Sequence, residues 1–319
     1  MNLAPIALFV YNRPEHTLKT INALAENDLA KNSLLYIYAD GAKTEDNEAD
    51  KKAVTQTREV IQNITGFKKV VQILSEKNKG LANSIIVGVT EVVNRHKKII
   101  VLEDDLIVSP YFLKYMNDGL DIYENNEEVI SIHAYNYPIK TMGLPNTFFM
   151  RGADCWGWAT WARGWNLFEA DTKKLLKHIE DKKLQFEFDI EGSYPYIKML
   201  KDQIENKVDS WAIRWYASAF INNKYTLYPK VTIIYNIGFD NSGTHSGSID
   251  NFNNKNWNNH SRVPIILYDK IENNRIALAR WKKYHREANA TNIQTTASLY
   301  QKLKRKCSNL SRKLISGIV

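Results

Sequence analysis

The stretch Lys97–Pro110, with the sequence KKIIVLEDDLIVSP, decides the fold class of this chain. Its residues Ile99–Leu102 form an unbroken apolar run rich in β-branched side chains, which is typical of a strand buried on both faces of a sheet. Three acids follow at once, namely Glu103, Asp104 and Asp105. Ligands bind at the carboxyl ends of strands in open α/β sheets. The stretch therefore predicts an α/β protein with a ligand site at the end of a central strand.

These acids need a positive partner, because carboxylates at the end of a buried strand are costly when nothing compensates them. A divalent cation that bridges phosphate groups would meet that need, since hard oxygen ligands suit Mg²⁺ and Mn²⁺. A second interpretation is a solvated acidic turn before a helix, because Ser109-Pro110 is itself a helix-start signal. A three-residue motif leaves both interpretations open.

The composition is that of a globular protein with a surplus of basic residues. The chain has 319 residues, with 43 Lys and Arg against 35 Asp and Glu. This surplus suits a phosphate-bearing ligand, a nucleic acid or an anionic membrane face. The two cysteines, Cys155 and Cys307, share no metal-ligand spacing, which favours a reducing, cytoplasmic compartment. No window approaches about 18 continuous apolar residues, so we expect neither a membrane-spanning helix nor a secretory leader.

The first 134 residues alternate between strand and helix patterns. Buried strands are expected at Pro5–Tyr11, Ser33–Ala39 and Val70–Leu74, each followed by a helix with apolar residues at helical spacing. This alternation predicts a doubly wound, mainly parallel sheet. Right-handed crossovers then place the ends of these strands on the edge that also carries the three acids.

Charged residues follow each of these strands. Arg13 and Lys79 would supply the positive charge that a diphosphate needs. Asp40 could accept a hydrogen bond from a nucleobase or a ribose. Each also has a simpler interpretation: Arg13 pairs with Glu15, Asp40 belongs to an Asp-Gly turn, and Lys79 precedes a helix.

Aromatic residues dominate the middle of the chain, where four of the eight tryptophans fall between positions 156 and 165. Such a cluster is usually core. Flat faces on Trp156, Trp158 and Trp211 would alternatively stack on an acceptor sugar. Asp209, two residues before Trp211, is either a helix N-cap or a general base that deprotonates a hydroxyl nucleophile.

The last part of the chain carries a loop and a basic helix. Asn236–Gly247 is rich in Gly and Asn and includes His245, and such loops can close over a bound nucleotide. Leucines and one isoleucine recur at helical spacing from position 299 to 318 among six basic residues. That pattern is typical of an interfacial helix attracted to anionic lipid, although a solvated helix would show it too.

Together these segments resemble the nucleotide-diphospho-sugar transferases of GT-A fold, especially the inverting N-acetylglucosaminyltransferase I group and bacterial family 2-like proteins with a Glu-Asp-Asp motif. The resemblance covers roughly residues 3 to 247. It is carried by these segments: Asn12-Arg13-Pro14, Asp40-Gly41, Leu81-Ala82, Leu102–Leu106 with Ser109–Phe112, Gly157-Trp158, Asp209-Ser210-Trp211 and Gly243–Gly247.

The resemblance implies a role for each matching residue. Arg13 would contact the donor diphosphate, Asp40 the nucleobase and Asp104 the ribose. Asp105, together with Glu103, would coordinate Mn²⁺ or Mg²⁺, and Asp209 would be the catalytic base. Two departures stand out: the family has paired acids where this chain has Asp209-Ser210, and a His-containing run where it has Lys77-Asn78-Lys79.

The expected function is an inverting, metal-dependent hexosyl- or N-acetylhexosaminyltransferase with a nucleoside-diphosphate sugar donor, a UDP-sugar being favoured. Its acceptor would be a lipid-linked glycan at the inner face of the plasma membrane, in bacterial surface polysaccharide synthesis. Residues 1–247 would form the transferase domain, divided into a nucleotide-binding half (1–134) and an acceptor-binding half (135–247), with 248–319 as an extension.

Two alternatives stay open: a sugar nucleotidyltransferase and a non-enzymatic nucleotide- or membrane-binding protein of the same fold. The first would be expected to carry a Gly-rich basic loop after its first strand, where this chain has Asn12–Glu15. Binding to nucleic acid is not expected, because the basic surplus lies on one terminal helix with a single aromatic residue.

Overall fold

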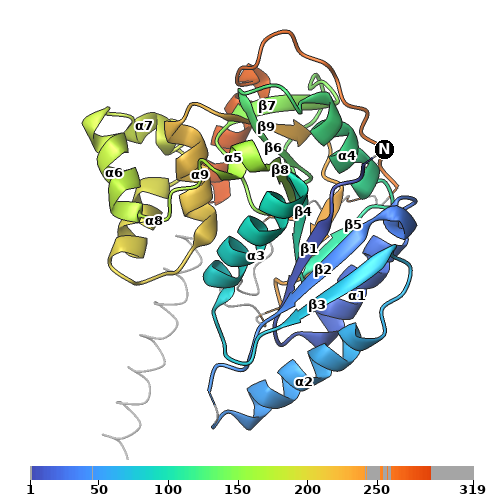
Figure 1. Ribbon diagram of the computed structural model, residues 1–319. Helices are drawn as coiled ribbons and strands as arrows, with labels where there is room; N and C mark the ends of the chain where they lie inside the picture. Colours follow the sequence, from blue (N-terminus) through green and yellow to red (C-terminus); the bar gives the residue numbers. More distant parts are fainter. Residues whose placement is uncertain are drawn as a thin grey trace, which may run out of the picture.

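The computed structural model describes residues 2–44, 46–240, 242, 252–253, 257 and 260–288. Within this part an eight-stranded sheet runs through the molecule (Figure 1). Its strands, in spatial order, are β3 (Lys69–Leu74), β2 (Leu34–Ala39), β1 (Ile6–Val10), β4 (Lys98–Glu103), β8 (Trp158–Trp161), β6 (Val129–His133), β9 (Tyr225–Pro229) and β7 (Thr147–Arg151). His245 and the basic segment at 299–318 lie outside the described residues.

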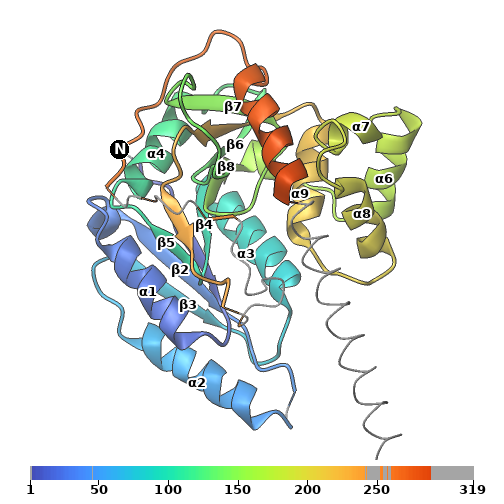
Figure 2. The ribbon, with the colours of Figure 1, turned by 180° about the vertical axis from the view of Figure 1, so that it is seen from behind.

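The first four strands pair in parallel and are joined by helices that cover both faces of the sheet. These helices are α1 (Pro14–Ala25), α2 (Glu48–Gln62) and α3 (Leu81–His96). Ile6, Leu8 and Val10 of β1 pack into the core that includes α1, whereas Ala7 and Phe9 pack toward α3. Figures 1 and 2 show α1 and α2 on one face of the sheet and α3 on the other. The predicted α/β class with a doubly wound, mainly parallel sheet is confirmed, and the arrangement is consistent with a GT-A fold.

The second half of the sheet is mixed, because β8 runs antiparallel between β4 and β6. Val101 of β4 lies opposite Trp158 of β8. The helices of this half, α4 (Phe112–Ile122) and α5 (Ala162–Trp165), pack against it, and a single 3₁₀ turn, η1 (Ala30–Asn32), precedes β2. The two expected halves, 1–134 and 135–247, therefore share one continuous sheet.

A small second sheet pairs β5 (Leu106–Val108) with β10 (Ile234–Asn236) in antiparallel register. The stretch Tyr228–Tyr235 reads as one strand in the sequence but is divided between β9 and β10 in the structure. The large-sheet strand ends at Pro229, which has no N–H to continue a ladder, and the chain then crosses to β5. As a result the residues after β10 return to the acids that follow β4.

The remaining helices form a layer beside the sheet, with α6 (Thr172–Asp181), α7 (Gln185–Phe188), α8 (Tyr196–Ile204) and α9 (Trp211–Ile221) around a core of their own. A further helix over residues 275–288 places Ala277 and Trp281 in the main core. This helix and α9 lie side by side in Figure 2. No described helix combines the length and apolar character needed to cross a membrane.

Candidate active site

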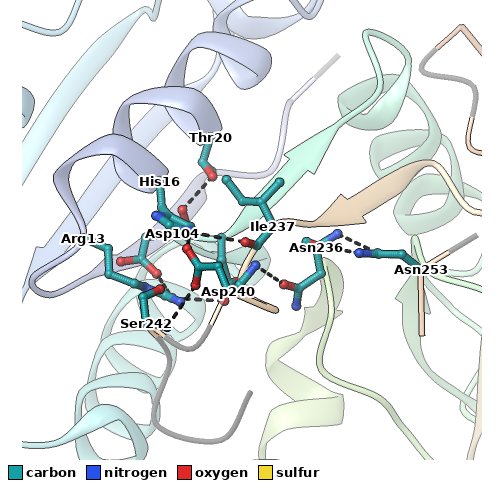
Figure 3. Close-up of polar contacts among 11 residues, drawn as sticks. Arg13, His16, Thr20, Asp104, Asn236, Ile237, Asp240, Ser242 and Asn253 are labelled. Carbon is teal, nitrogen blue, oxygen red and sulfur yellow. Dashed lines mark hydrogen bonds and ion pairs between the residues drawn. The ribbon is translucent and has the colours of Figure 1, made fainter. Parts of the chain in front are cut away.

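The three acids and Arg13 meet at the carboxyl edge of the sheet because β1 and β4 are parallel neighbours. Phe9 of β1 lies opposite Glu103, the last residue of β4. Four residues after Phe9, Arg13 stands at the N-terminus of α1, where Pro14 fixes the start of the helix. Its Nη2 donates to a carboxylate oxygen of Asp104 and lies 3.0 Å from Oδ2 of Asp105 (Figure 3). One guanidinium thus bridges two of the three acids.

Negative charge still exceeds positive charge at this cluster. Burial, with repulsion by Asp105 and Asp104, raises the pKa of Glu103 to about 8, against the opposing effect of Arg13. Burial likewise raises the pKa of Asp104 to about 6, although Arg13 counteracts the rise. The pKa of Arg13 is raised because attraction to Asp104 and Asp105 outweighs the effect of its own burial. The cluster would therefore be stabilised by more positive charge.

Two polar atoms of the bridge are buried without a hydrogen-bond partner among the described residues: Nη1 of Arg13 and Oδ2 of Asp104. Buried polar atoms are almost always hydrogen-bonded in proteins, so an orphaned donor beside an orphaned acceptor needs an explanation. A ligand that offers both an acceptor for Arg13 and a cation or donor for Asp104 would satisfy both atoms.

The segment after β10 lies against the acidic turn (Figure 3). The N–H of Ile237 donates to the carbonyl of Asp105 over 2.8 Å, and the N–H of Gly238 donates to Oδ1 of Asn236 over 2.7 Å. A Cβ on Gly238 would lie 2.4 Å from Oδ2 of Asp105. Only glycine therefore lets this backbone pass so close to the carboxylate.

His16, one helical turn after Arg13, fastens this segment to α1. Its Nε2 lies 3.2 Å from the carbonyl oxygen of Ile237 and 3.1 Å from Oδ2 of Asp240. Thr20, one turn further, donates to the carbonyl of Asp104 over 2.8 Å. One face of α1 therefore holds both the acidic turn and the segment that covers it.

The donor set of this cluster fits a divalent cation that is only partly held by protein. Among the residues that the structure describes, no group of three or more His, Cys, Asp and Glu side chains is arranged to hold a metal ion. Mg²⁺ in phosphate-transfer sites is usually held by one or two carboxylates, with water and substrate phosphates as the other ligands. Carboxylates at Glu103 and Asp105, and the orphaned oxygen of Asp104, provide that kind of incomplete set.

Asp40 lies at the end of β2, on the same edge, and holds a loop. Its two carboxylate oxygens accept hydrogen bonds from the backbone N–H groups of Gly41, Lys79 and Gly80 at 2.8–3.1 Å. The side chain of Lys79 is exposed. The geometry therefore gives Asp40 a role in fixing the turn before α3, and its contact with a nucleobase stays a prediction.

A second polar network supports the loop that carries Arg13. Both oxygens of Asp50, in the first turn of α2, accept from the hydroxyl of Tyr11 at 2.6 and 2.7 Å. Asp50 also accepts from the side chain of Asn12 at 2.7 Å and from the N–H of Lys43 at 2.8 Å. Asn12 is thereby anchored directly beside Arg13.

The tryptophan cluster is mainly core, so the acceptor-stacking roles predicted for Trp158 and Trp211 were wrong. Trp158 is fully buried, Trp211 is 3% exposed, and their rings stack on each other at 5.4 Å. Neither ring has a face left for a sugar. Trp156 is different: it is half-buried and its ring lies 5.8 Å from that of Phe239, which follows Gly238.

Asp209 stands before α9, where Ser210 and not Asp209 is the N-cap: the Ser210 hydroxyl accepts from the N–H of Ile213 at 3.3 Å. The Asp209 carboxylate is exposed and pairs with Arg214 at 2.9 Å. Its link to the cluster is indirect, through Trp211 and Trp158 to β4. The structure thus brings Arg13, Glu103, Asp104 and Asp105 together and leaves Asp209 on the surface of the helical layer.

Sequence reasoning missed His16, Asp50 and Gly238. His16 follows Arg13 at i+3, a spacing that places both on one helix face, so it could have been found. Asp50 is 39 positions from Tyr11 in the sequence, and no local pattern connects the two. Gly238 falls within Asn236–Gly247, and the Gly- and Asn-rich composition of that segment does not single out this glycine.

No family model matches the sequence, and no curated protein matches it. Three solved structures are similar in part. TarS of S. aureus has a TM-score of 0.37 at 13% identity, over 73% of this chain and 36% of TarS. A UDP-glucose pyrophosphorylase complexed with UDP-glucose scores 0.27 at 15% identity, over 47% of this chain and 64% of that one. Mouse xyloside xylosyltransferase 1, in its apo form, scores 0.26 at 12% identity, over 42% and 54%.

The chain therefore spans between about a third and two thirds of the length of these structures. Such similarities are partial, and the function proposed below rests on the residues of the site.

Proposed function

We propose that this protein is a glycosyltransferase that uses a nucleoside-diphosphate sugar and a divalent cation. The observation that carries the proposal is the bridge of Arg13 across Asp104 and Asp105, with an orphaned donor and an orphaned acceptor at the carboxyl edge of a parallel sheet. A diphosphate–cation pair offers what both atoms lack, since phosphate oxygens accept from guanidinium groups and the cation binds carboxylate oxygens.

Asp105 and Glu103 would hold Mn²⁺ or Mg²⁺ together with oxygens of the donor diphosphate. When bound, such an ion neutralises the charge that develops on the departing nucleoside diphosphate. Arg13 would take part in the same task by donating to a phosphate oxygen, for which it must release at least one of its carboxylate partners. Asp104 pairs with Arg13 through its side chain and accepts from the Thr20 hydroxyl through its carbonyl, and its carboxylate would accept from the ribose.

In the proposed reaction the bond from the anomeric carbon to the phosphate oxygen breaks as a hydroxyl oxygen of the acceptor attacks from the opposite side. The hydroxyl proton passes to the carboxylate of Asp209, and the nucleoside diphosphate leaves with the electron pair of the broken bond. A single displacement of this kind inverts the anomeric centre. Asp209 would exchange its ion pair with Arg214 for the acceptor hydroxyl.

The finer points of the proposal come from the sequence. They are a UDP-sugar donor, transfer of a hexose or N-acetylhexosamine, a lipid-linked acceptor in bacterial surface polysaccharide synthesis, and a cytoplasmic protein held at the inner membrane face by the basic segment at 299–318. Trp156 is the acceptor-side aromatic that keeps an exposed edge.

The test is a thermal-shift titration with UDP, GDP, CMP and ADP, each with and without Mn²⁺. A ligand that binds only the folded protein raises its melting temperature by mass action, with about 2.7 kcal/mol of added stability at 100 times Kd. We expect one nucleotide to stabilise the protein in the presence of Mn²⁺, and we expect Asp105→Ala to lose that shift.

Asp118→Ala is the matched control, because Asp118 is a surface acid paired with Lys114 on α4, and it should keep the full shift. Absence of a shift with every nucleotide would overturn the proposal. A shift that does not depend on Mn²⁺ would contradict the proposed metal requirement and leave Arg13 as the proposed phosphate ligand. Asp209→Asn should bind nucleotide normally and lose transfer; if it retains transfer, another base acts.

A further inference from the structure

A pocket of about 110 Å³ lies away from the acid cluster, where the helical layer meets the sheet and the helix over 275–288. Its lining comes from six separate parts of the chain, each of which contributes an aromatic or acidic side chain. They are Tyr137, Asp154, Tyr196 of α8, Tyr216 of α9, Tyr228 of β9 and Trp281. The proposed glycosyl transfer uses none of these residues.

The rings of the pocket form two walls. On one side Trp281 packs edge-on against Tyr137 at 4.9 Å and against Tyr228 at 4.8 Å between ring centroids. On the other side Tyr196 and Tyr216 lie 4.4 Å apart. Gly152, with φ of +103°, makes room for the second wall, because a Cβ there would lie 2.4 Å from the ring of Tyr216.

Asp154 carries a negative charge at this pocket without a basic partner in the described part of the chain. Its Oδ1 accepts from the N–H of Cys155 at 2.8 Å, its carboxylate also accepts from the Cys155 thiol, and its Oδ2 has a long contact of 3.5 Å with the hydroxyl of Tyr137. Burial raises the pKa of Tyr137, Tyr196 and Tyr228 well above the usual range, and the charge of Asp154 adds to each rise. The charge of Asp154 therefore acts on rings of both groups.

The lining also holds one cation, Arg151, whose Nε is buried without a hydrogen-bond partner among the described residues. The guanidinium of Arg151 stacks over the ring of Phe220 at 3.9 Å and donates to the Phe220 carbonyl at 3.0 Å. Glu191 pairs with Lys282. Glu187 is exposed to solvent. Asp154 is thus the acid in the pocket whose charge is left uncompensated.

We propose that this pocket binds an ammonium group, with the rings of Tyr137, Tyr196, Tyr228 and Trp281 around it and Asp154 as its counter-ion. Aromatic faces attract cations, and cages of such rings recognise methylated ammonium groups. The volume suits a group of that size and not a whole drug-sized ligand, for which pockets usually exceed about 300 Å³. The ligand is therefore a small amine or quaternary ammonium compound, or the aminated end of a larger molecule.

The test compares choline and tetramethylammonium with 3,3-dimethylbutan-1-ol, the uncharged isostere of choline, by isothermal titration calorimetry on the full chain. We expect both cations to bind and the neutral isostere to bind at least about tenfold more weakly, since it lacks the charge that Asp154 and the rings attract. Ethanolamine and glucosamine distinguish a primary amine from a quaternary ammonium ligand. Equal binding of choline and its isostere, or binding of none of these compounds, would overturn the proposal.

Two pairs of variants locate the site. Asp154→Asn should lose binding, whereas Glu191→Gln, which removes an acid of the same pocket that is already paired, should keep it. Tyr196→Phe should bind as the wild type does and Tyr196→Leu should not, because the ring and not its hydroxyl attracts the cation. Retained binding in Asp154→Asn with a wild-type circular dichroism spectrum would place the ligand elsewhere. Nucleotide binding in Asp154→Asn reports separately on the proposed donor site.

Discussion

Two arginine–aspartate pairs stand at the two ends of the proposed reaction, and their surroundings differ more than their geometry. Arg13 lies 3.0 Å from Asp105 at the donor edge, and Arg214 lies 2.9 Å from Asp209 before α9. The side chain of Asp105 is 13% exposed and that of Asp209 is 60% exposed. Arg13 also serves a second acid, whereas Arg214 serves one.

This difference shows that burial, and not the distance between the charges, decides what each pair does for the protein. Exposed pairs contribute about 0–1 kcal/mol because water screens them and solvates each partner alone. Buried charges depend on their partner, because nothing else solvates them. At the carboxyl edge of the sheet one guanidinium therefore holds two acids, whereas Asp209 can exchange its partner at little cost to the fold.

The largest expected effect is on stability when each arginine is removed. Arg13→Ala leaves three acids uncompensated at the end of β4, and we expect a loss of about 3 kcal/mol in the free energy of unfolding. Arg214→Ala should cost less, about 1 kcal/mol, because water solvates Asp209 once its partner is gone, although the Arg214 side chain is itself only 11% exposed. Urea denaturation of both variants measures the comparison directly. Equal losses would mean that the two pairs are energetically alike and that burial is not the deciding factor.

A smaller effect is expected where the covering segment touches the acids. Gly238→Ala places a methyl group against Oδ2 of Asp105, so the carboxylate must turn away, and we expect about a tenfold loss of Mn²⁺-dependent nucleotide affinity, or about 1.4 kcal/mol. Gly143→Ala is the control: its φ of +81° makes the substitution strained although the added methyl group meets no atom within 4 Å, and we expect it to keep the nucleotide affinity. If both variants bind nucleotide equally well, the segment after β10 does not shape the donor edge.

The last effect concerns pH. In the protein without a bound cation, burial and repulsion by Asp105 and Asp104 raise the pKa of Glu103 to about 8, whereas the unfolded chain releases this proton at ordinary Glu values. The contribution of this group is therefore greatest at low pH, declines as pH rises from about 5 to 8, and changes no further above that. Glu103→Gln should lack this decline, as measured by urea denaturation at several pH values. Parallel curves for the two proteins would show that Glu103 is not buried among like charges.

The parallel half of the sheet could be predicted from the sequence because its signals are local. Apolar β-branched runs such as Ile99–Leu102 mark buried strands, and handedness then places their ends on one edge. The meeting of Arg13 with Asp104 and Asp105 follows from that topology alone. The raised pKa of Glu103 could not be predicted from the topology, because it depends on how deeply the turn is buried.

The mixed half resisted prediction because its contacts are distant in sequence. No local sequence pattern near Ile234–Asn236 predicts that this segment pairs with Leu106–Val108. The exposure of a tryptophan is likewise set by its neighbours in space: Trp156 and Trp158 are two positions apart, yet one is half-buried and the other is enclosed by Trp165, Trp211 and Trp215.

The insertion of β8 between β4 and β6 has a consequence for how the chain is made. On the ribosome, β4 and β6 emerge before the strand that joins them, because β8 begins only at Trp158. Until then both strands present unpaired backbone edges, which attract other strands. A fragment that ends at residue 134 would keep those edges bare. During synthesis, residues 1–134 therefore cannot complete their part of the sheet until the four residues of β8 have been made.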